Sequence, residues 1–202
     1  MNEYLDLLNY ISQKKKVDAG TLEGLMDNIA AWESDYKGKM TPMPEAAQVG
    51  KGPGRGAFQF ELSPEAAKAK GLKAGSGAAN TALTRLKQFY AAENLEPPTW
   101  INELKKDFDP AALSYEQQKM LFLGDTMMAK GKDLSKLNEM SQGEWWGRFH
   151  QTQNIPEKVK AFDANAARRY YAENPPVTYE ELAGMAGTGL ENPLLARTDM
   201  FT

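Results

Sequence analysis

The chain contains no cysteine and a single histidine, His150, among its 202 residues. Without cysteine, neither a disulfide framework nor a thiolate metal site is available, and one histidine does not build a histidine metal cluster. We therefore expect no metal or other cofactor in its chemistry. No run of about 18 apolar residues occurs, and this argues against stable membrane insertion.

A large excess of charge of either sign is also missing, since the net charge is −3 and the pI is about 5.4. Proteins that bind nucleic acids through phosphate contacts usually carry a basic surface, so the sequence argues against a nucleic-acid partner. The first residues lack the basic lead and apolar core of a secretion signal. We therefore expect synthesis in the cytoplasm as a soluble product without a signal peptide.

Helical spacing dominates the sequence, and the 42% hydrophobic composition is enough for one substantial core. Apolar residues at helical spacing predict helices over residues 3–13, 78–93, 114–129 and 156–174. Ser114 and Gln117 resemble a capping box that starts the third of these helices, and Gly124 would allow it to pack closely against a neighbouring helix. The residues expected to face inward are Leu83, Leu86, Phe89 and Tyr90 on the second helix and Leu113, Gln117, Met120, Leu121, Gly124 and Met128 on the third. The fold class is therefore predicted to be mainly α. We expect one domain over residues 1–175, followed by a C-terminal extension at 176–202 that either docks to a partner or has no role.

The segment 22–62 carries the clearest chemical signal. Leu22, Met26 and Ile29 follow the spacing of one buried helix face, and Glu33 lies four residues beyond Ile29 on the same face. Apolar neighbours disfavour the charged form of a carboxyl group, so its pKa should rise and it can act as a proton donor. The alternative is that Glu33 marks a frayed helix end with its side chain in water.

A glycine- and proline-rich loop follows Glu33 and leads into residues 57–61. Glycines allow tight turns and a close approach of backbone to a ligand. Alternation in the 57–61 run predicts a short strand with Phe58 and Phe60 on the buried side and Gln59 on the other. We therefore expect Gln59 to face a groove opposite Glu33.

Three motifs in this order resemble those of lytic transglycosylases and goose-type lysozymes. They are Glu33-Ser34 at the end of an apolar helix, Gly56-Ala57-Phe58-Gln59-Phe60 after the loop, and Asn80-Thr81-Ala82-Leu83-Thr84-Arg85-Leu86 on the next helix. Each motif alone is weak, and their order over residues 22–93 carries the resemblance.

This resemblance implies a lysozyme-like fold with at most a small β element beside the cleft. It implies an enzyme that cleaves the β-1,4 bond between N-acetylmuramic acid and N-acetylglucosamine in peptidoglycan glycan strands. Glu33 would be the single general acid and base, and Ser34, Phe58, Gln59 and Phe60 would bind substrate. Whether the product is an anhydro sugar or a hydrolysed one stays open.

The chain also departs from this family, because its usual Ala-Tyr-Asn-Ala-Gly motif is absent. The nearest counterpart by position, residues 120–125, lacks the tyrosine. Asp35 and Asp125 remain candidates for an assisting carboxylate. Adjacent tryptophans point in different directions on a helix, so either one of Trp145 and Trp146 is buried while the other faces a groove, or the pair is a buried anchor for the C-terminal tail. For His150 we expect a structural hydrogen-bonding role.

Two functions remain open at this level. The first is an active peptidoglycan-degrading enzyme carried on a bacteriophage virion, where tethering supplies a high local concentration at the cell wall of the periplasm. The second is a virion structural or assembly protein that keeps a lysozyme-like fold with little or no activity. Other virion proteins are possible partners in both cases.

Overall fold

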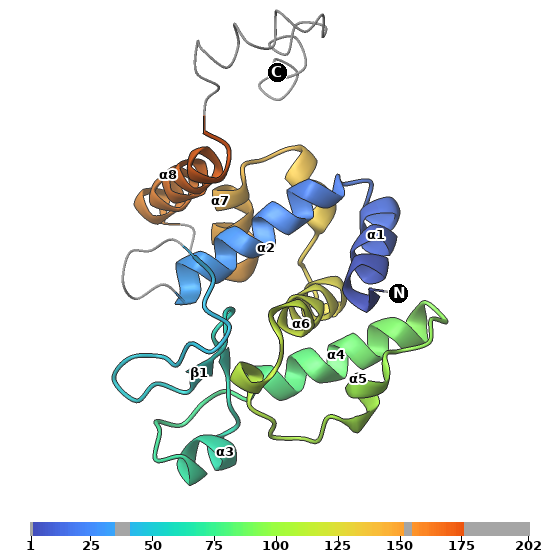
Figure 1. Ribbon diagram of the computed structural model, residues 1–202, viewed down its shortest axis with the longest axis vertical. Helices are drawn as coiled ribbons and strands as arrows, with labels where there is room; N and C mark the ends of the chain where they lie inside the picture. The colour runs from blue at the N-terminus through green and yellow to red at the C-terminus, as the bar shows by residue number, and fades with distance from the viewer. Residues whose placement is uncertain (1, 35–40, 152–154, 176–202) are drawn as a thin grey trace, which may run out of the picture. The chain divides into compact units, whose positions relative to one another are not determined.

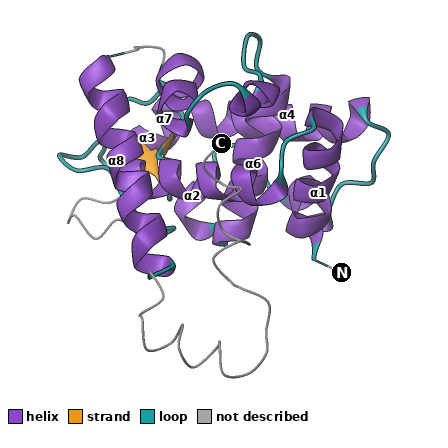
Figure 2. Ribbon diagram, turned by 90° about the horizontal axis from the view of Figure 1, so that it is seen from above, coloured by secondary structure: helices purple, strands orange, loops and turns teal. Residues whose placement is uncertain are grey.

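The structure is a computed structural model that describes residues 2–34, 41–151 and 155–175. The described residues are mainly helical with one small two-stranded sheet, and this confirms the predicted fold class (Figures 1 and 2). The helices are α1 (Glu3–Lys15), α2 (Ala19–Ser34), α3 (Pro64–Ala69), α4 (Ala78–Ala92), α5 (Thr99–Glu103), α6 (Tyr115–Met128), α7 (Gln142–Trp145) and α8 (Pro156–Glu173). Strands β1 (Gly54–Arg55) and β2 (Phe60–Glu61) form the sheet, and η1 (Pro110–Ala112), η2 (Leu134–Asn138) and η3 (Trp146–His150) are short helical turns.

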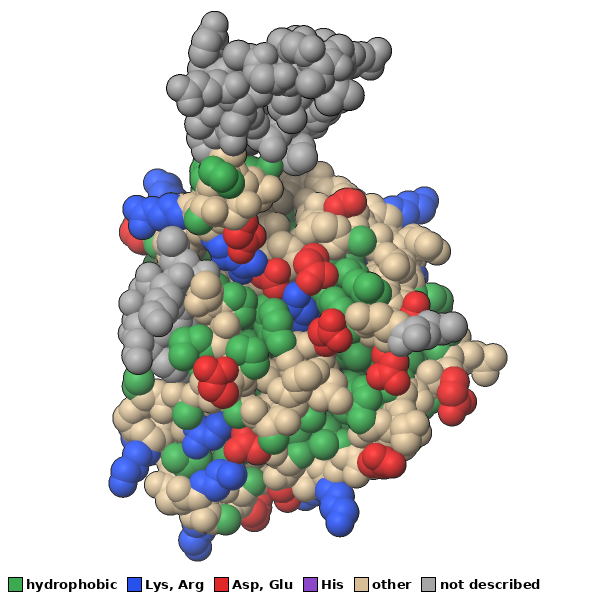
Figure 3. All heavy atoms as spheres, in the orientation of Figure 1, with side chains coloured by type: hydrophobic (Ala, Val, Ile, Leu, Met, Phe, Trp, Pro, Cys, Tyr) green, Lys and Arg blue, Asp and Glu red, His purple; other side chains and the backbone are tan. Residues whose placement is uncertain are grey.

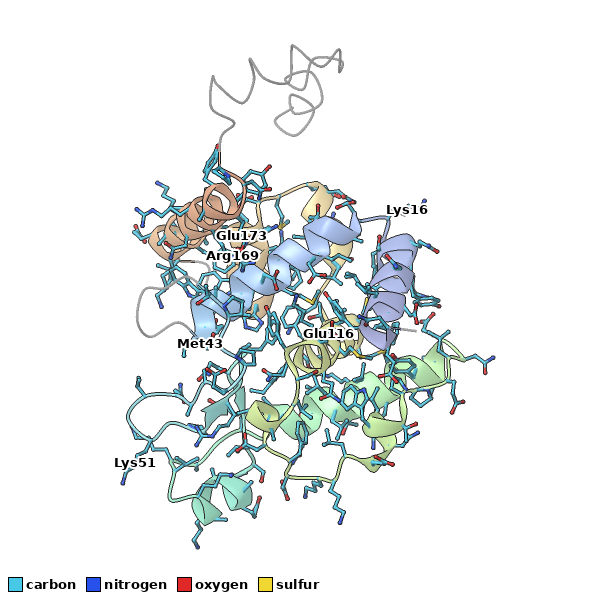
Figure 4. The ribbon with its side chains drawn as sticks, in the orientation of Figure 1. Lys16, Met43, Lys51, Glu116, Arg169 and Glu173 are labelled. Atoms are coloured by element: carbon cyan, nitrogen blue, oxygen red, sulfur yellow. The ribbon has the colours of Figure 1, made fainter. Side chains whose placement is uncertain are left out.

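The chain divides into two compact units, residues 1–166 and 167–202. The second unit is described only as far as residue 175, where Arg169 and Glu173 form an ion pair at 2.9 Å on the last turns of α8 (Figure 4). The predicted extension at 176–202 lies outside the described residues. The first unit contains the core and the candidate site.

Helices α4 and α6 pack side by side within the first unit (Figure 1). Ser114 and Gln117 form the predicted capping box at the start of α6, so the local sequence fixes where this helix begins. Leu83, Leu86, Phe89 and Tyr90 on α4 are buried as the helical spacing predicted. The inward face of α6 was partly mispredicted: Met128 is 37% exposed, whereas Gln118 is completely buried.

Gly124 allows the close contact between α4 and α6. A Cβ atom at this position would lie 2.6 Å from the Leu86 Cα atom, closer than real Cβ contacts. The prediction that Gly124 permits close helix packing is therefore confirmed.

Gly124→Ala should accordingly lower the free energy of unfolding by about 1–3 kcal/mol, because the added methyl group overpacks this contact. Gly24→Ala on α2 is the matched control, since its Cβ would meet only the Gln142 side chain at 3.4 Å. Alanine is favoured over glycine inside a helix, so the control should be neutral or slightly stabilising. Urea denaturation measures both variants, and equal stability of the two would contradict the packing argument.

The segment between α2 and α3 forms the small sheet. Gly54 pairs with Glu61 and Arg55 with Phe60 in antiparallel register. The predicted strand over residues 57–61 is therefore wrong for residues 57–59, which form a turn with Gln59 at a φ of 49°. Local alternation gave the burial of the two phenylalanines correctly, but it did not reveal this turn.

The buried side chain of Gln118 fixes this turn from α6. Its Oε1 atom accepts a hydrogen bond from the Ala57 amide at 2.7 Å, and its Nε2 atom donates to the carbonyls of Pro44 and Leu113 at 3.0 Å each. Gly56 lies against it with a φ of 76°, and a Cβ there would approach Gln118 Oε1 to 2.4 Å. One amide therefore holds three segments together, because each bond satisfies a buried polar group.

Candidate functional site

Glu33 lies in the last turn of α2, one residue before the helix ends at Ser34. Met26 and Ile29 on the same helix are completely buried, so the face that carries Glu33 is directed into the core. The Glu33 side chain is 18% exposed. Its Oε1 atom accepts hydrogen bonds from Gln151 Nε2 at 2.7 Å and from Trp146 Nε1 at 3.3 Å.

Two opposing effects act on the Glu33 carboxyl group. Burial raises its pKa above the usual range, and this is the largest effect. The hydrogen bonds from Gln151 and Trp146 and the charge of Lys158 act in the opposite direction, because they favour the ionised form. The net result is a raised pKa, which agrees with the prediction that Glu33 is held against apolar neighbours.

An aromatic cluster adjoins this carboxyl group through Trp146. The Trp146 ring stacks on Phe162 at a centroid distance of 5.0 Å, and Trp32 meets Trp146 edge-on at 5.5 Å. Trp145 and Trp146 are both buried, which favours the buried alternative over a ring that faces a groove. Trp145 is anchored by its Nε1 atom, which donates to the Asp133 carbonyl at 2.8 Å.

Residues 146–150 form a single π-helical turn directly after α7. This turn carries both Trp146 and His150, and both side chains are close to Glu33. π-Helical turns interrupt the normal helical spacing and occur frequently at functional sites. In this protein, the turn places both Trp146 and His150 next to Glu33.

A cavity of about 660 Å³ opens beside Glu33. Its lining comes from α2, the small sheet and its loop, α4, α6 and η3, so it is built from segments far apart in the chain. Acidic and basic side chains are interspersed on the face of the molecule in Figure 3. The cavity is lined by Glu33, Gln48, Phe58, Gln59, Phe60, Glu61, Ser76, Ala78, Thr81, Arg85, Asp125, Lys132, His150 and Gln151.

The predicted substrate residues Phe58, Gln59 and Phe60 all line this cavity. The Phe58 ring stacks on Phe122 at 4.9 Å, so it also forms part of the core. Gln59 is partly exposed, and its Nε2 atom donates to the Gly56 carbonyl at 2.7 Å. The Gln59 side chain therefore reaches the cavity from a turn that it helps to stabilise itself.

Ser34 occupies a different position from the one predicted. It is completely buried and is absent from the cavity lining. Its Oγ atom donates to the Ala30 carbonyl at 2.6 Å and accepts from the Met43 amide at 2.8 Å. Met43 lies close to the end of α2 (Figure 4), so Ser34 ties the returning chain to this helix instead of contacting a ligand.

Of the two candidate assisting carboxylates, Asp125 lines the cavity and Asp35 lies outside the described residues. Both Asp125 oxygens are paired with cations. Arg85 Nη1 lies 2.6 Å from Oδ1, and Lys132 Nζ lies 3.0 Å from Oδ2. The predictions did not include Arg85 or Lys132 as site residues. Arg85 belongs to the motif over residues 80–86, which could have marked it, whereas no local pattern marks Lys132.

His150 also lines the cavity, and its Nε2 atom lies 3.9 Å from Glu33 Oε1. Burial and the charge of Lys132 lower its pKa to about 4, against the opposing charge of Asp125, so the ring is neutral at pH 7. Its Nδ1 atom is buried and has no hydrogen-bond partner among the described residues. The prediction that His150 serves as a structural hydrogen-bonding group is therefore not supported at this atom.

The missing partner at Nδ1 selects one neutral form of the ring. A proton on Nδ1 would be a buried donor without an acceptor, whereas a proton on Nε2 faces the cavity and Glu33. The Nε2–H form is therefore favoured. His150 then presents a neutral donor beside the Glu33 carboxyl group.

His150→Gln should make stability less sensitive to acid. The unfolded chain binds a proton on this residue below about pH 6.5, but the folded protein binds it only near pH 4, so stability falls as pH decreases through this window. The effect should reach up to about 3 kcal/mol at the acid end. Denaturation curves from pH 4 to 7 measure the difference between the two proteins.

Glu33 contributes the opposite pH dependence to the free energy of unfolding in the same experiment. Its raised pKa means that the folded protein retains a proton above the usual range, so its contribution to stability is lost as pH rises through the folded pKa. Measuring His150→Gln in the Glu33→Gln background removes this opposing slope. Since the chain has one histidine, an unchanged slope between pH 5.5 and 6.5 would contradict a buried neutral His150.

Within residues 2–34, 41–151 and 155–175, no group of three or more His, Asp or Glu side chains is arranged to hold a metal ion. No helix in the same ranges combines the length and apolar character needed to cross a membrane. Comparisons with family models, curated proteins and solved structures gave no match to this chain. The fold and site therefore define a mainly helical protein with a partly desolvated glutamate at the edge of a polar cavity.

Proposed function

We propose that this protein is a peptidoglycan-degrading enzyme that cleaves the β-1,4 bond between N-acetylmuramic acid and N-acetylglucosamine. The observation that carries the proposal is the position of Glu33: a carboxyl group with a raised pKa on the wall of a cavity of about 660 Å³. A raised pKa lets such a group keep its proton to a higher pH than an ordinary carboxyl group, which suits a proton donor. The proposal includes a lysozyme-like arrangement in which a helix ends at the catalytic glutamate beside a small β element.

In the proposed reaction, protonated Glu33 donates its proton to the glycosidic oxygen, and the bond from that oxygen to the anomeric carbon breaks. The substrate's own acetamido group stabilises the positive charge that develops on the anomeric carbon. The Glu33 carboxylate then removes a proton, either from the sugar's 6-hydroxyl group to give an anhydro product or from water to give a hydrolysed one. One carboxylate thus serves as acid and then as base.

Asp125 is a poor second carboxylate for this reaction. A nucleophile or base needs a free oxygen, but both Asp125 oxygens are paired, with Arg85 at 2.6 Å and with Lys132 at 3.0 Å. The arrangement therefore favours a single-glutamate scheme over the common scheme with paired carboxylates.

One observation favours the second candidate, a virion structural or assembly protein with little or no activity. Gln151 and Trp146 both donate to Glu33 Oε1, and such bonds stabilise an ionised, structural carboxylate. The burial effect is nevertheless the larger one on its pKa, and the opening of the cavity at Glu33 supports the active enzyme. We therefore retain the enzyme as the proposed function. The same proposal places the enzyme on a virion, from which it acts on the cell wall.

The test is product analysis after incubation with purified peptidoglycan. Mass spectrometry distinguishes an anhydro product from a hydrolysed one, because the hydrolysed product carries one additional water. Either product, together with falling turbidity, supports the enzyme. Intact glycan strands after prolonged incubation with folded protein would overturn it and leave the structural role.

A further inference from the structure

A cluster of charged groups lies in the same cavity as Glu33 but takes no part in the reaction described above. Arg85 on α4 and Asp125 on α6 are sequence neighbours of the two residues in the close helix contact: Arg85 directly precedes Leu86, and Asp125 directly follows Gly124. This contact therefore brings Arg85 and Asp125 together. Lys132, after the end of α6, completes the cluster by pairing with the second Asp125 oxygen.

The cluster has cationic donors in excess of its own needs. A guanidinium group has five N–H donors and an ammonium group has three, and Asp125 takes one from each through the bonds at 2.6 and 3.0 Å. Two positive charges face one negative charge, so the cluster itself carries an excess of one positive charge. The side chains of Arg85 and Lys132 are 34% and 19% exposed, so they are partly desolvated and still accessible from the cavity.

His150 connects this cluster to the glutamate. Its Nε2 atom lies 3.9 Å from Glu33 Oε1, and the charges of Lys132 and Asp125 both act on its ring. Glu61, the third carboxylate in the cavity lining besides Glu33 and Asp125, accepts a hydrogen bond from the Ser76 amide at 2.8 Å. Glu33 and the cationic side chains of Arg85 and Lys132 therefore line one continuous cavity.

We propose that Arg85 and Lys132, held in place by Asp125, form a subsite for a carboxylate group on the glycan strand. The inference rests on the proposed function and deepens it by naming the substrate group that this side of the cavity recognises. N-acetylglucosamine carries no carboxylate. N-acetylmuramic acid without a peptide stem carries a lactyl carboxylate; where a stem is attached, that carboxyl group is in an amide bond and the carboxylates are those of the stem. Burial disfavours the charged form of Glu33, and this lessens the repulsion of such a ligand.

The experiment measures binding by calorimetry in the Glu33→Gln background, where the ligand stays intact. Three tetrasaccharides are compared: neutral chitotetraose, an alternating N-acetylglucosamine–N-acetylmuramic acid tetrasaccharide with free lactyl carboxylates, and the same sugar with peptide stems. Lys132→Gln is the test substitution. Lys130→Gln is the matched control, because Lys130 is exposed, precedes Lys132 by two residues and does not line the cavity.

We expect an acidic tetrasaccharide to bind more tightly than chitotetraose at low salt. Lys132→Gln should weaken the binding of the acidic tetrasaccharide by about five- to tenfold, because it removes one partly screened charge pair. It should not change the binding of chitotetraose, and Lys130→Gln should not change the binding of either sugar. Preference for the free lactyl form identifies the lactyl carboxylate, and preference for the stem-bearing form identifies the peptide carboxylates. High salt should reduce the preference in both cases.

Equal binding of all three sugars, no binding of any of them, or equal weakening of all three by Lys132→Gln would overturn the subsite. The proposed function fails separately, in the product analysis with wild-type protein. Charge-dependent binding without cleavage would support the subsite and overturn the enzyme. Cleavage without charge-dependent binding would do the reverse.

Discussion

Glu33→Gln is expected to reduce peptidoglycan cleavage by about 10²–10⁴-fold, the contribution typical of a general acid or base. The amide keeps the shape of the side chain, and its oxygen still accepts from Trp146 and Gln151, whose donors lie 3.3 and 2.7 Å from Glu33 Oε1. It has no proton to give to the glycosidic oxygen and no carboxylate to remove one afterwards. A turbidity assay on purified peptidoglycan measures the loss.

Stability separates this catalytic effect from a structural one. Burial disfavours the charged form of Glu33, so ionisation of the wild-type residue costs stability at a pH above its raised pKa. The neutral amide avoids that cost, and Glu33→Gln should therefore be at least as stable as the wild type at pH 8. Glu45→Gln, at an exposed position, serves as the control and should keep full activity. Wild-type turnover by folded Glu33→Gln protein would instead make Glu33 a buried structural residue.

Lys119→Met is expected to lower the free energy of unfolding by about 3 kcal/mol, because removal of one partner leaves buried charges uncompensated. Lys119 is 4% exposed on α6. Its Nζ atom lies 2.7 Å from Asp27 Oδ1 and also binds Glu23, both on α2. The Tyr115 hydroxyl group donates to Asp27 at 2.6 Å. In Lys119→Met, Asp27 therefore keeps this hydrogen bond but loses the positive charge of the ammonium group.

Urea denaturation measures the effect of Lys119→Met, and a variant that breaks a surface ion pair, Lys14→Met, serves as the control. Lys14 binds Glu93 at 2.5 Å, but its side chain is 42% exposed, so Lys14→Met should change stability little. Adding Glu23→Gln and Asp27→Asn to Lys119→Met should recover part of the loss, because no uncompensated carboxylate then remains. Equal stability of Lys119→Met and Lys14→Met would show that the buried network does not hold α2 against α6.

Features that depend on neighbours in sequence were predictable for this chain. Ser114 and Gln117 are three residues apart, and this spacing alone specifies the capping box that starts α6. The spacing of Met26, Ile29 and Glu33 placed the carboxyl group on an apolar face, and its pKa is indeed raised by burial. The helical class follows from helical spacing of apolar residues, and the burial of Phe58 and Phe60 follows from the alternation within residues 57–61.

Features that depend on distant segments were decided only by the tertiary structure. Trp146 and Gln151 hydrogen-bond to Glu33 although they follow it by 113 and 118 residues in the sequence. Arg85 pairs with Asp125 across a separation of 40 residues. The turn at residues 57–59 depends on Gln118, whose buried side-chain oxygen accepts the hydrogen bond of the Ala57 N–H group. In a strand, that N–H group would donate to a neighbouring strand instead. Periodicity within one element gives the direction of a side chain but not its partner, because the partner depends on how helices and loops pack against one another.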